Sequence, residues 1–293
     1  MPWCESLLYA DRVIRAVERH CAACRSVANR RSSISRRIAA EQTNPGEYSR
    51  MTATDSNRLK QQVAVVTGAS SGIGLAIARE LHALDMRLVL TARSAERLGD
   101  ICAELDAERV VADITNPQVP QRLLAAALER FGRCDAVINN AGTIEVGPIA
   151  AIDIDKVCAM VRVNVEAAYR VAYTFIRHFV ERGSGHLINI SSVMGTKVRP
   201  TAGAYSGTKY AFEALSEALR MEVAGTGVSV TCIEPGLVRT ELHRDYSIHP
   251  TVSMNVPHPL EPEDVARCIR FVLTQSENVR IPRMMVLPRE HQI

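Results

Sequence analysis

The 293-residue chain lacks any continuous run of eighteen apolar residues, and its start lacks the long apolar core of a secretory signal. A helix that crosses a bilayer needs about twenty predominantly apolar residues. We therefore expect no transmembrane helix and no membrane partner.

Cysteine is present, but without the spacing of a disulfide scaffold. The eight cysteines are scattered along the chain, and such a pattern is typical of the reducing cytoplasm, where we expect the protein to be. Cys21 and Cys24 form a CxxC pair beside His20, yet no second ligand pair accompanies them. The sequence therefore predicts no metal site.

Net positive charge is confined to the first sixty residues. Residues 1–60 hold 11 Lys and Arg against 6 Asp and Glu, a net charge of +5, whereas the whole chain carries +3 and the remainder therefore about −2. A domain of that charge gives no electrostatic reason to bind nucleic acid. The run NRRSSISRR has the composition of a transit peptide, but Glu5, Asp11 and Glu18 argue against that interpretation. We interpret residues 1–50 as an upstream extension, either poorly ordered or not always translated, and residues 1–60 as lying outside the folded domain.

Short apolar runs alternate with helical runs over residues 61–293. The strand-like runs lie at 63–67, 87–91, 109–112, 134–138, 186–191, 228–233 and 284–287. This alternation is typical of a parallel sheet with helices on both faces. About 230 residues are enough to bury one core. We predict a single α/β domain with a doubly wound parallel sheet of the Rossmann type.

A glycine-rich turn follows the first of these strands, in the segment VAVVTGASSGIG. Gly68, Gly72 and Gly74 come directly after the apolar run 63–67, and an amphipathic helix follows. Glycines let a backbone approach phosphates closely, and the free N–H groups and dipole of a helix N-terminus favour negative charge. The spacing is GxxxGxG rather than GxGxxG. The segment predicts a pyrophosphate site, with a turn that binds no ligand as the alternative.

A second motif combines a phenol, an ammonium and a hydroxyl. Tyr205 and Lys209 are four residues apart in a predicted helix, so their side chains share one face. A neighbouring ammonium favours the phenolate and should lower the tyrosine pKa from about 10 towards the range useful for acid–base catalysis. Ser192, at the end of an apolar strand thirteen residues upstream, can bring its hydroxyl to the same place. The three groups suit proton transfer to or from a carbonyl or alcohol oxygen, although a YxxxK pair alone is commonly a solvated helix face.

Taken together, these motifs resemble the short-chain dehydrogenase/reductase family. The matching pieces fall in the order and spacing of that family over residues of about 61 to 293: Thr67 to Gly74 (TGASSGIG), Asn139 to Gly142 (NNAG), Asn164, Ser192, Tyr205, Lys209 and Pro235-Gly236.

The resemblance implies roles for four catalytic residues. Tyr205 would be the general acid and base, and Lys209 would lower its pKa and hold the nicotinamide ribose. Ser192 would bind the substrate oxygen and stabilise the charge that develops there. Asn164 would hold a water that links Lys209 to solvent, or else would only bond to backbone within its helix.

The resemblance also implies a nicotinamide cofactor and its contacts. Arg93 stands nineteen residues after Gly74, where an arginine accommodates the 2′-phosphate of NADP and an acid would favour NAD. We therefore expect NADP(H) in preference to NAD(H), unless Arg93 is only a solvated charge. The full predicted set of cofactor contacts is Gly68, Ser70, Ser71, Gly72, Ile73, Gly74, Arg93, Asp113, Asn140, Ala141, Gly142, Tyr205, Lys209, Pro235, Gly236, Val238 and Thr240.

The resulting hypothesis is an NADP(H)-dependent oxidoreductase that interconverts a carbonyl and a secondary alcohol. The C-terminal segment is similar, more loosely, to the branch with serine and small 3-hydroxy acid dehydrogenases. Alternatives are a reductase of 3-oxoacyl thioesters or lipid-like ketones, a nucleotide-sugar epimerase, and a cofactor-binding sensor or scaffold; the filled catalytic positions argue against the last. The family also implies a homotetramer or homodimer.

The sequence does not identify the substrate. Residues 237–262 contain three prolines, and we expect this segment to fold over the pocket and to set specificity by its shape. Four basic residues could meet a substrate carboxylate or could be surface charges: Arg199, Arg239, His243 and Arg244.

Overall fold

The computed structural model describes residues 58–244, 246 and 249–292. The CxxC pair and nearly all of the predicted extension lie outside the described residues. Leu59, which we assigned to the extension, is buried in the core, so the described fold already includes residues just before position 61. None of the described helices is long and apolar enough to cross a membrane.

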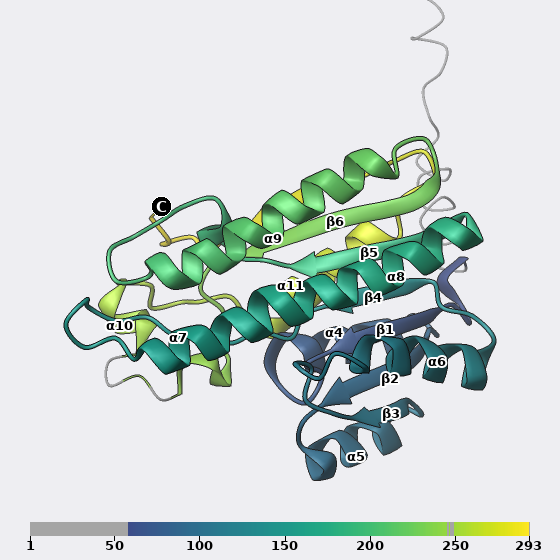
Figure 1. Ribbon diagram of the computed structural model, residues 1–293, viewed down its shortest axis with the longest axis horizontal. Helices are drawn as coiled ribbons and strands as arrows, with labels where there is room; N and C mark the ends of the chain where they lie inside the picture. Colours follow the sequence, from purple (N-terminus) through teal and green to yellow (C-terminus); the bar gives the residue numbers. More distant parts are fainter. Residues whose placement is uncertain (1–57, 245, 247–248, 293) are drawn as a thin grey trace, which may run out of the picture. The chain divides into compact units, whose positions relative to one another are not determined.

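All seven predicted strands are present and form one parallel sheet in the order β3-β2-β1-β4-β5-β6-β7 (Figure 1). The strands are β1 (Val63–Thr67), β2 (Arg87–Ala92), β3 (Glu108–Val111), β4 (Ala136–Asn139), β5 (Ser184–Ile190), β6 (Gly227–Pro235) and β7 (Arg283–Val286). The predicted doubly wound α/β fold is therefore confirmed, with strand ends shifted by a few residues.

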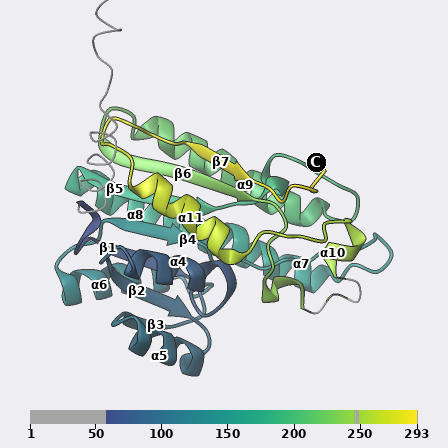
Figure 2. The same cartoon turned by 180° about the vertical axis from the view of Figure 1, so that it is seen from behind.

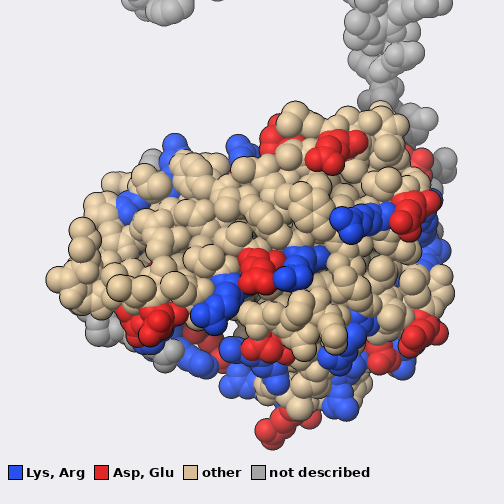
Figure 3. Space-filling view, viewed as in Figure 1, with Lys and Arg blue, Asp and Glu red and all other residues tan. Residues whose placement is uncertain are grey.

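Helices cover both faces of the sheet. They are α4 (Gly72–His82), α5 (Ala95–Glu104), α6 (Val119–Phe131), α7 (Ile154–Val161), α8 (Ala168–Arg182), α9 (Gly203–Glu222), the short α10 (Pro250–Ser253) and α11 (Pro262–Leu273). In Figure 1, α6, α8 and α9 lie in front of the sheet, and in Figure 2 α4 and α11 lie in front of the opposite face. On the surface shown in Figure 3, acidic and basic side chains of the described residues are interspersed.

The central strands β1, β2 and β4 are mostly apolar because both of their faces are buried. Successive residues of β1 alternate between two hydrophobic clusters: Ala64 and Val66 pack with side chains of α4 and α11, and Val63 and Val65 pack with those of α6, α8 and α9. The period of two in a strand places these neighbours on opposite faces. This packing on both faces holds the central strands in place, and the strands in turn position the loops at their ends.

One buried carboxylate fixes the amino-terminal ends of β1 and β4. Asp135 accepts hydrogen bonds from the Val63 N–H at 2.8 Å, from Arg133 at 2.7 Å and from Arg182 at 2.6 Å. Burial raises the pKa of Asp135, but the hydrogen bonds from Arg133, Val63 and Arg182 outweigh burial and hold this pKa below its ordinary value. Asp135 therefore stabilises the fold in its ionised form.

Replacing Asp135 with Ala should lower the free energy of unfolding by about 3 kcal/mol, since the change leaves buried donors without a partner. The folded-state pKa lies below the unfolded-state value of about 3.9. The contribution is therefore complete above that value and is lost as the pH falls through the folded-state pKa. Urea denaturation from pH 7 to pH 3 measures both effects.

A matched control is Lys60→Ala, which removes an exposed ion pair with Asp85 at 3.7 Å and should cost no more than about 0.5 kcal/mol. Equal losses in the two variants, or a loss for Asp135→Ala that does not shrink in acid, would contradict this account.

Candidate active site

A cavity of about 780 Å³ opens at the carboxyl ends of the strands. Its lining residues follow β1, β2, β3, β4, β5 and β6, and strand order reverses between β1 and β4 beneath it. Open parallel sheets bind ligands at such a reversal. Every predicted catalytic and cofactor-contact residue lines this one cavity, with the exception of Asn164.

The glycine turn after β1 lies against the neighbouring strand. Gly68 and Gly72 adopt φ angles of +66° and +51°, which side chains disfavour. A Cβ at Gly74 would lie 2.2 Å from the Gly68 carbonyl oxygen, so only glycine fits there. The Asn140 side-chain amide donates to the Thr67 carbonyl at 2.9 Å, which ties the turn to the end of β4. The N-terminus of α4 thus faces the cavity, which the half-buried residues Ser70 to Ile73 line.

Arg93 stands at the end of the cavity beside β2. Its side chain is exposed and forms no hydrogen bond or ion pair with any residue that the structure describes. Asp113, which lines the same end, accepts two hydrogen bonds from Thr115, and these bonds, with a smaller effect of Arg93, lower its pKa. A second basic residue, Arg97, also lines this end; sequence reasoning missed it, although it lies four residues after Arg93 on α5.

Tyr205 and Lys209 meet at the other end of the cavity, and both are buried on α9. The Lys209 ammonium donates to the Ile190 carbonyl oxygen at 2.9 Å and lies 6.0 Å from the centre of the Tyr205 ring. Burial lowers the pKa of Lys209 to about 8, while the nearby Cys232 and Glu213 oppose that shift. Lys209 therefore remains mostly protonated at neutral pH.

The direction of the Tyr205 pKa differs from the sequence-based expectation. Burial raises this pKa, and the opposing effects come from a hydrogen bond with Ser192 and from the charge of Arg199. Lys209 donates its hydrogen bond to the Ile190 carbonyl and makes none to the Tyr205 hydroxyl. In this protein Tyr205 is therefore held in its neutral form, which can donate a proton.

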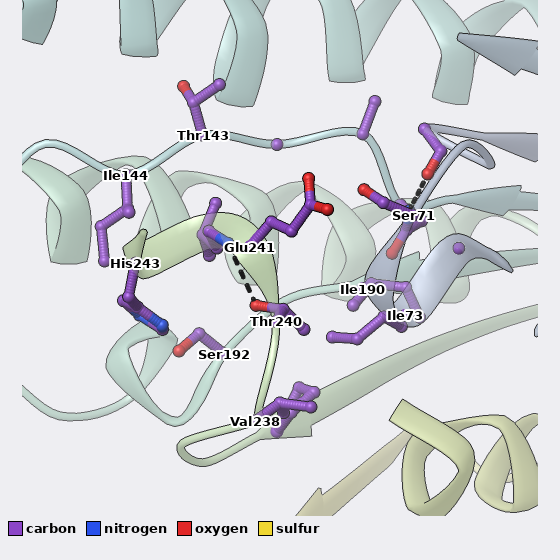
Figure 4. A pocket seen from close by; sticks show the side chains of 18 of the residues that line it. Ser71, Ile73, Thr143, Ile144, Ile190, Ser192, Val238, Thr240, Glu241 and His243 are labelled. Carbon is purple, nitrogen blue, oxygen red and sulfur yellow. Dashed lines mark hydrogen bonds between the residues drawn. The ribbon is translucent and has the colours of Figure 1, made fainter. Parts of the chain in front are cut away.

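Ser192 follows β5 and begins the short 3₁₀ turn Val193–Gly195, where its Oγ accepts from the Met194 N–H at 3.1 Å. In Figure 4 the Ser192 hydroxyl lies beside the His243 ring, which comes from the segment after β6. The serine and the tyrosine thus reach the same end of the cavity from two elements.

Asn164 lies behind the cavity wall rather than in it. It belongs to a π-helical turn, Arg162–Ala167, between α7 and α8. Its side chain accepts from the Thr143 N–H at 2.9 Å and donates to the Thr143 carbonyl at 2.8 Å and to Thr208 at 3.2 Å. These bonds fix the loop beside Gly142, which lies next to Lys209. The predicted water relay through Asn164 stays a prediction.

Described residues of the segment after β6 line the cavity, among them Leu237, Thr240, His243, Pro250 and Met254. Thr240 lies close to the glycine turn, since a Cβ on Gly72 would be 3.1 Å from its methyl group. The Glu241 carboxylate projects into the cavity in Figure 4 and pairs with Arg97 at 3.1 Å. This ion pair joins the segment after β6 to α5.

The sequence analysis missed several lining residues that no local motif identifies, namely Thr143, Ile144, Val163, Met194 and His291. His291 comes from the C-terminal segment, and a Cβ on Gly236 would lie 2.6 Å from its ring. Only the folded chain brings such residues to the site.

Comparison with known proteins agrees with this geometry. The model of the short chain dehydrogenase family matches residues 62–250. An uncharacterized oxidoreductase of Staphylococcus aureus strain USA300 is 38% identical over 233 residues, which cover 78% of this chain and 98% of that protein.

Two solved structures illustrate the similarity of fold. The closed form of serine dehydrogenase complexed with NADP+ has a TM-score of 0.74 at 28% identity and covers 79% of this chain and 97% of its own. The 3-ketoacyl-(acyl-carrier-protein) reductase from Brucella melitensis complexed with NADH has a TM-score of 0.73 at 25% identity and covers 79% and 99%.

The chain belongs to the short-chain dehydrogenase family. It is an NAD(P)-dependent oxidoreductase that acts on CH–OH groups.

Proposed function

We propose that this protein uses NADP(H) to interconvert a carbonyl and a secondary alcohol, with Tyr205 as the group that donates and accepts the proton. The supporting observation is one continuous cavity that has the glycine turn and Arg93 at one end and Ser192, Tyr205 and Lys209 at the other. An elongated dinucleotide with phosphates at one end and a reactive ring at the other fits that distribution of groups.

The residues present fit such a cofactor on independent grounds. The close approach of Gly74 to Gly68 leaves backbone open to a pyrophosphate. The Lys209 ammonium has three donors and uses one on the Ile190 carbonyl, so two can hold ribose hydroxyls. When bound, the nicotinamide exchanges a hydride with the substrate carbon.

The protein's own part is to place the oxygen and to move the proton. In the direction of reduction, the carbonyl carbon gains the hydride while the Tyr205 hydroxyl gives its proton to the oxygen. Burial keeps Tyr205 protonated before that step. Ser192 donates a hydrogen bond to the same oxygen and stabilises its developing charge. The Lys209 ammonium then favours the phenolate that is left.

Tyr205→Phe tests this role, because it removes the transferable proton and almost nothing else. We expect kcat to fall by about 10²- to 10⁴-fold, as is typical when a general acid–base group is lost, with unchanged affinity for NADPH. Turnover is followed by NADPH absorbance with a panel of ketones, aldehydes and 3-hydroxy acids. Tyr210→Phe, on the exposed side of the same helix, is the matched control. More than about a tenth of wild-type activity in Tyr205→Phe would rule out the assignment.

The preference for NADP(H) rests on Arg93, whose guanidinium has no competing partner among the described side chains. A guanidinium binds a phosphate by charge-assisted, two-point contact, and an acid in its place would repel it. Neighbouring structures contain NADP+ in one case and NADH in another, so relatives do not decide the cofactor.

Arg93→Asp should lower the ratio of kcat/KM for NADPH to that for NADH by at least about tenfold. Arg122→Asp makes the same charge change at an exposed position of α6 outside the cavity and should leave the ratio unchanged. A wild-type preference for NADH, or equal ratios in wild type and Arg93→Asp, would show that Arg93 does not select the cofactor.

A further inference from the structure

Four arginines line the cavity, and they differ in what balances their charge. Arg97 and Arg244 both pair with Glu241, at 3.1 and 3.5 Å. Arg93 lies at the β2 end, where the proposed function gives it a phosphate. Arg199 has no carboxylate within ion-pair distance in the described part of the chain, and its buried Nε has no hydrogen-bond partner there.

Arg199 lines the end of the cavity where Ser192, Tyr205 and Lys209 lie. Arg199 lies in the loop between Ser192 and α9. Burial raises the pKa of Tyr205 and lowers those of His243 and His291, and the charge of Arg199 opposes the first shift and adds to the other two. These three residues come from α9, from the 3₁₀ turn Glu241–His243 and from the C-terminal segment. All three line the same cavity as Arg199.

Other polar groups at this end also lack partners. His243 Nδ1, the Tyr246 hydroxyl and His291 Nδ1 are buried without a hydrogen bond to any described residue. Burial lowers the pKa of His243 to about 4, so this ring is neutral at pH 7. Arg199 therefore supplies the positive charge of the cluster, beside groups that can donate or accept single hydrogen bonds.

Neighbouring acids do not neutralise Arg199. Glu145 acts on Tyr246, whose pKa it raises in addition to the larger effect of burial. Glu290 Oε1 pairs with Arg289 at 3.5 Å, and Glu290 Oε2 is buried without a hydrogen bond to any described residue. A partly buried guanidinium without an anion is unfavourable for the fold, so its position is explained best by an anion that arrives with the substrate.

We propose that Arg199 binds the carboxylate of a small oxo or hydroxy acid, while Ser192 and Tyr205 engage the reacting oxygen of the same molecule. The inference rests on the proposed function and names its substrate class. A bidentate contact between guanidinium and carboxylate would fix both the end and the face of the substrate that meet Tyr205. Neutral ketones and thioesters would lack this contact.

The first test compares each acid with its methyl ester, which keeps the carbonyl and removes the charge. The substrates are 2-oxobutanoate, 3-oxobutanoate and 4-oxopentanoate, reduced with NADPH. For the best acid, Arg199→Met should lower kcat/KM by about 10- to 100-fold, the range expected when a hydrogen-bonded charge contact is lost. The ester should change by less than about threefold, and Arg199→Lys should recover part of the loss. Lys197→Met, an exposed residue of the same loop, is the matched control.

The second test needs no turnover. The same oxo acids are titrated calorimetrically into the wild-type protein saturated with NADP+, which cannot reduce them. We expect binding of an acid but not of its ester, and loss of that binding in Arg199→Met with unchanged affinity for NADP+. Wild-type protein that binds acid and ester alike, or acid binding that survives Arg199→Met, would overturn the proposal.

The two tests separate this inference from the proposed function. Failure of Tyr205→Phe to lose activity would count against the proton-transfer role while Arg199-dependent binding of the acids could still be observed. If esters are reduced as well as acids and activity still requires Tyr205, the proposed anion site at Arg199 is wrong, whereas the proposed proton transfer stands.

Discussion

The reversal of strand order between β1 and β4 is the constraint on which the site depends. Chain connections leave the sheet in opposite directions on either side of this point, so no loop fills the space above it. The glycine turn after β1 and the loop after β4 meet there, and Asn140 joins them by a hydrogen bond to Thr67 at 2.9 Å. Both rest on strands buried on two faces, which makes the floor of the cavity rigid.

Burial and charge together set the pKa values of Tyr205 and Lys209. Burial raises the pKa of Tyr205, and it lowers the pKa of Lys209, which lies at about 8, so each shift favours the neutral form of its group. A hydrogen bond from Ser192 and the charge of Arg199 act against burial at the tyrosine. The Tyr205 phenol starts protonated, and nearby cations favour its anion. Such a group can both donate and accept the transferred proton.

Local sequence patterns predicted the fold, and the resemblance to a known family supplied most residues of the candidate site. Apolar runs of strand length identified all seven strands, and the glycine spacing and the Tyr205–Lys209 pair placed both ends of the cavity. The pairing of Arg97 with Glu241, separated by 144 residues, and the isolation of Arg199 depend on tertiary structure. The pKa direction of Tyr205 was also missed, because a helix pattern shows which side chains are neighbours but not how deeply they are buried.

The most direct test of the account is to follow the hydride. Reduction of an accepted carbonyl substrate with NADPH that carries deuterium at the transferable C4 position should place one deuterium on the carbinol carbon of the product, as measured by mass spectrometry and NMR. The account predicts nearly complete transfer, because the cofactor and the substrate share one cavity at the Tyr205 end. A product that carries hydrogen from solvent at that carbon would contradict it.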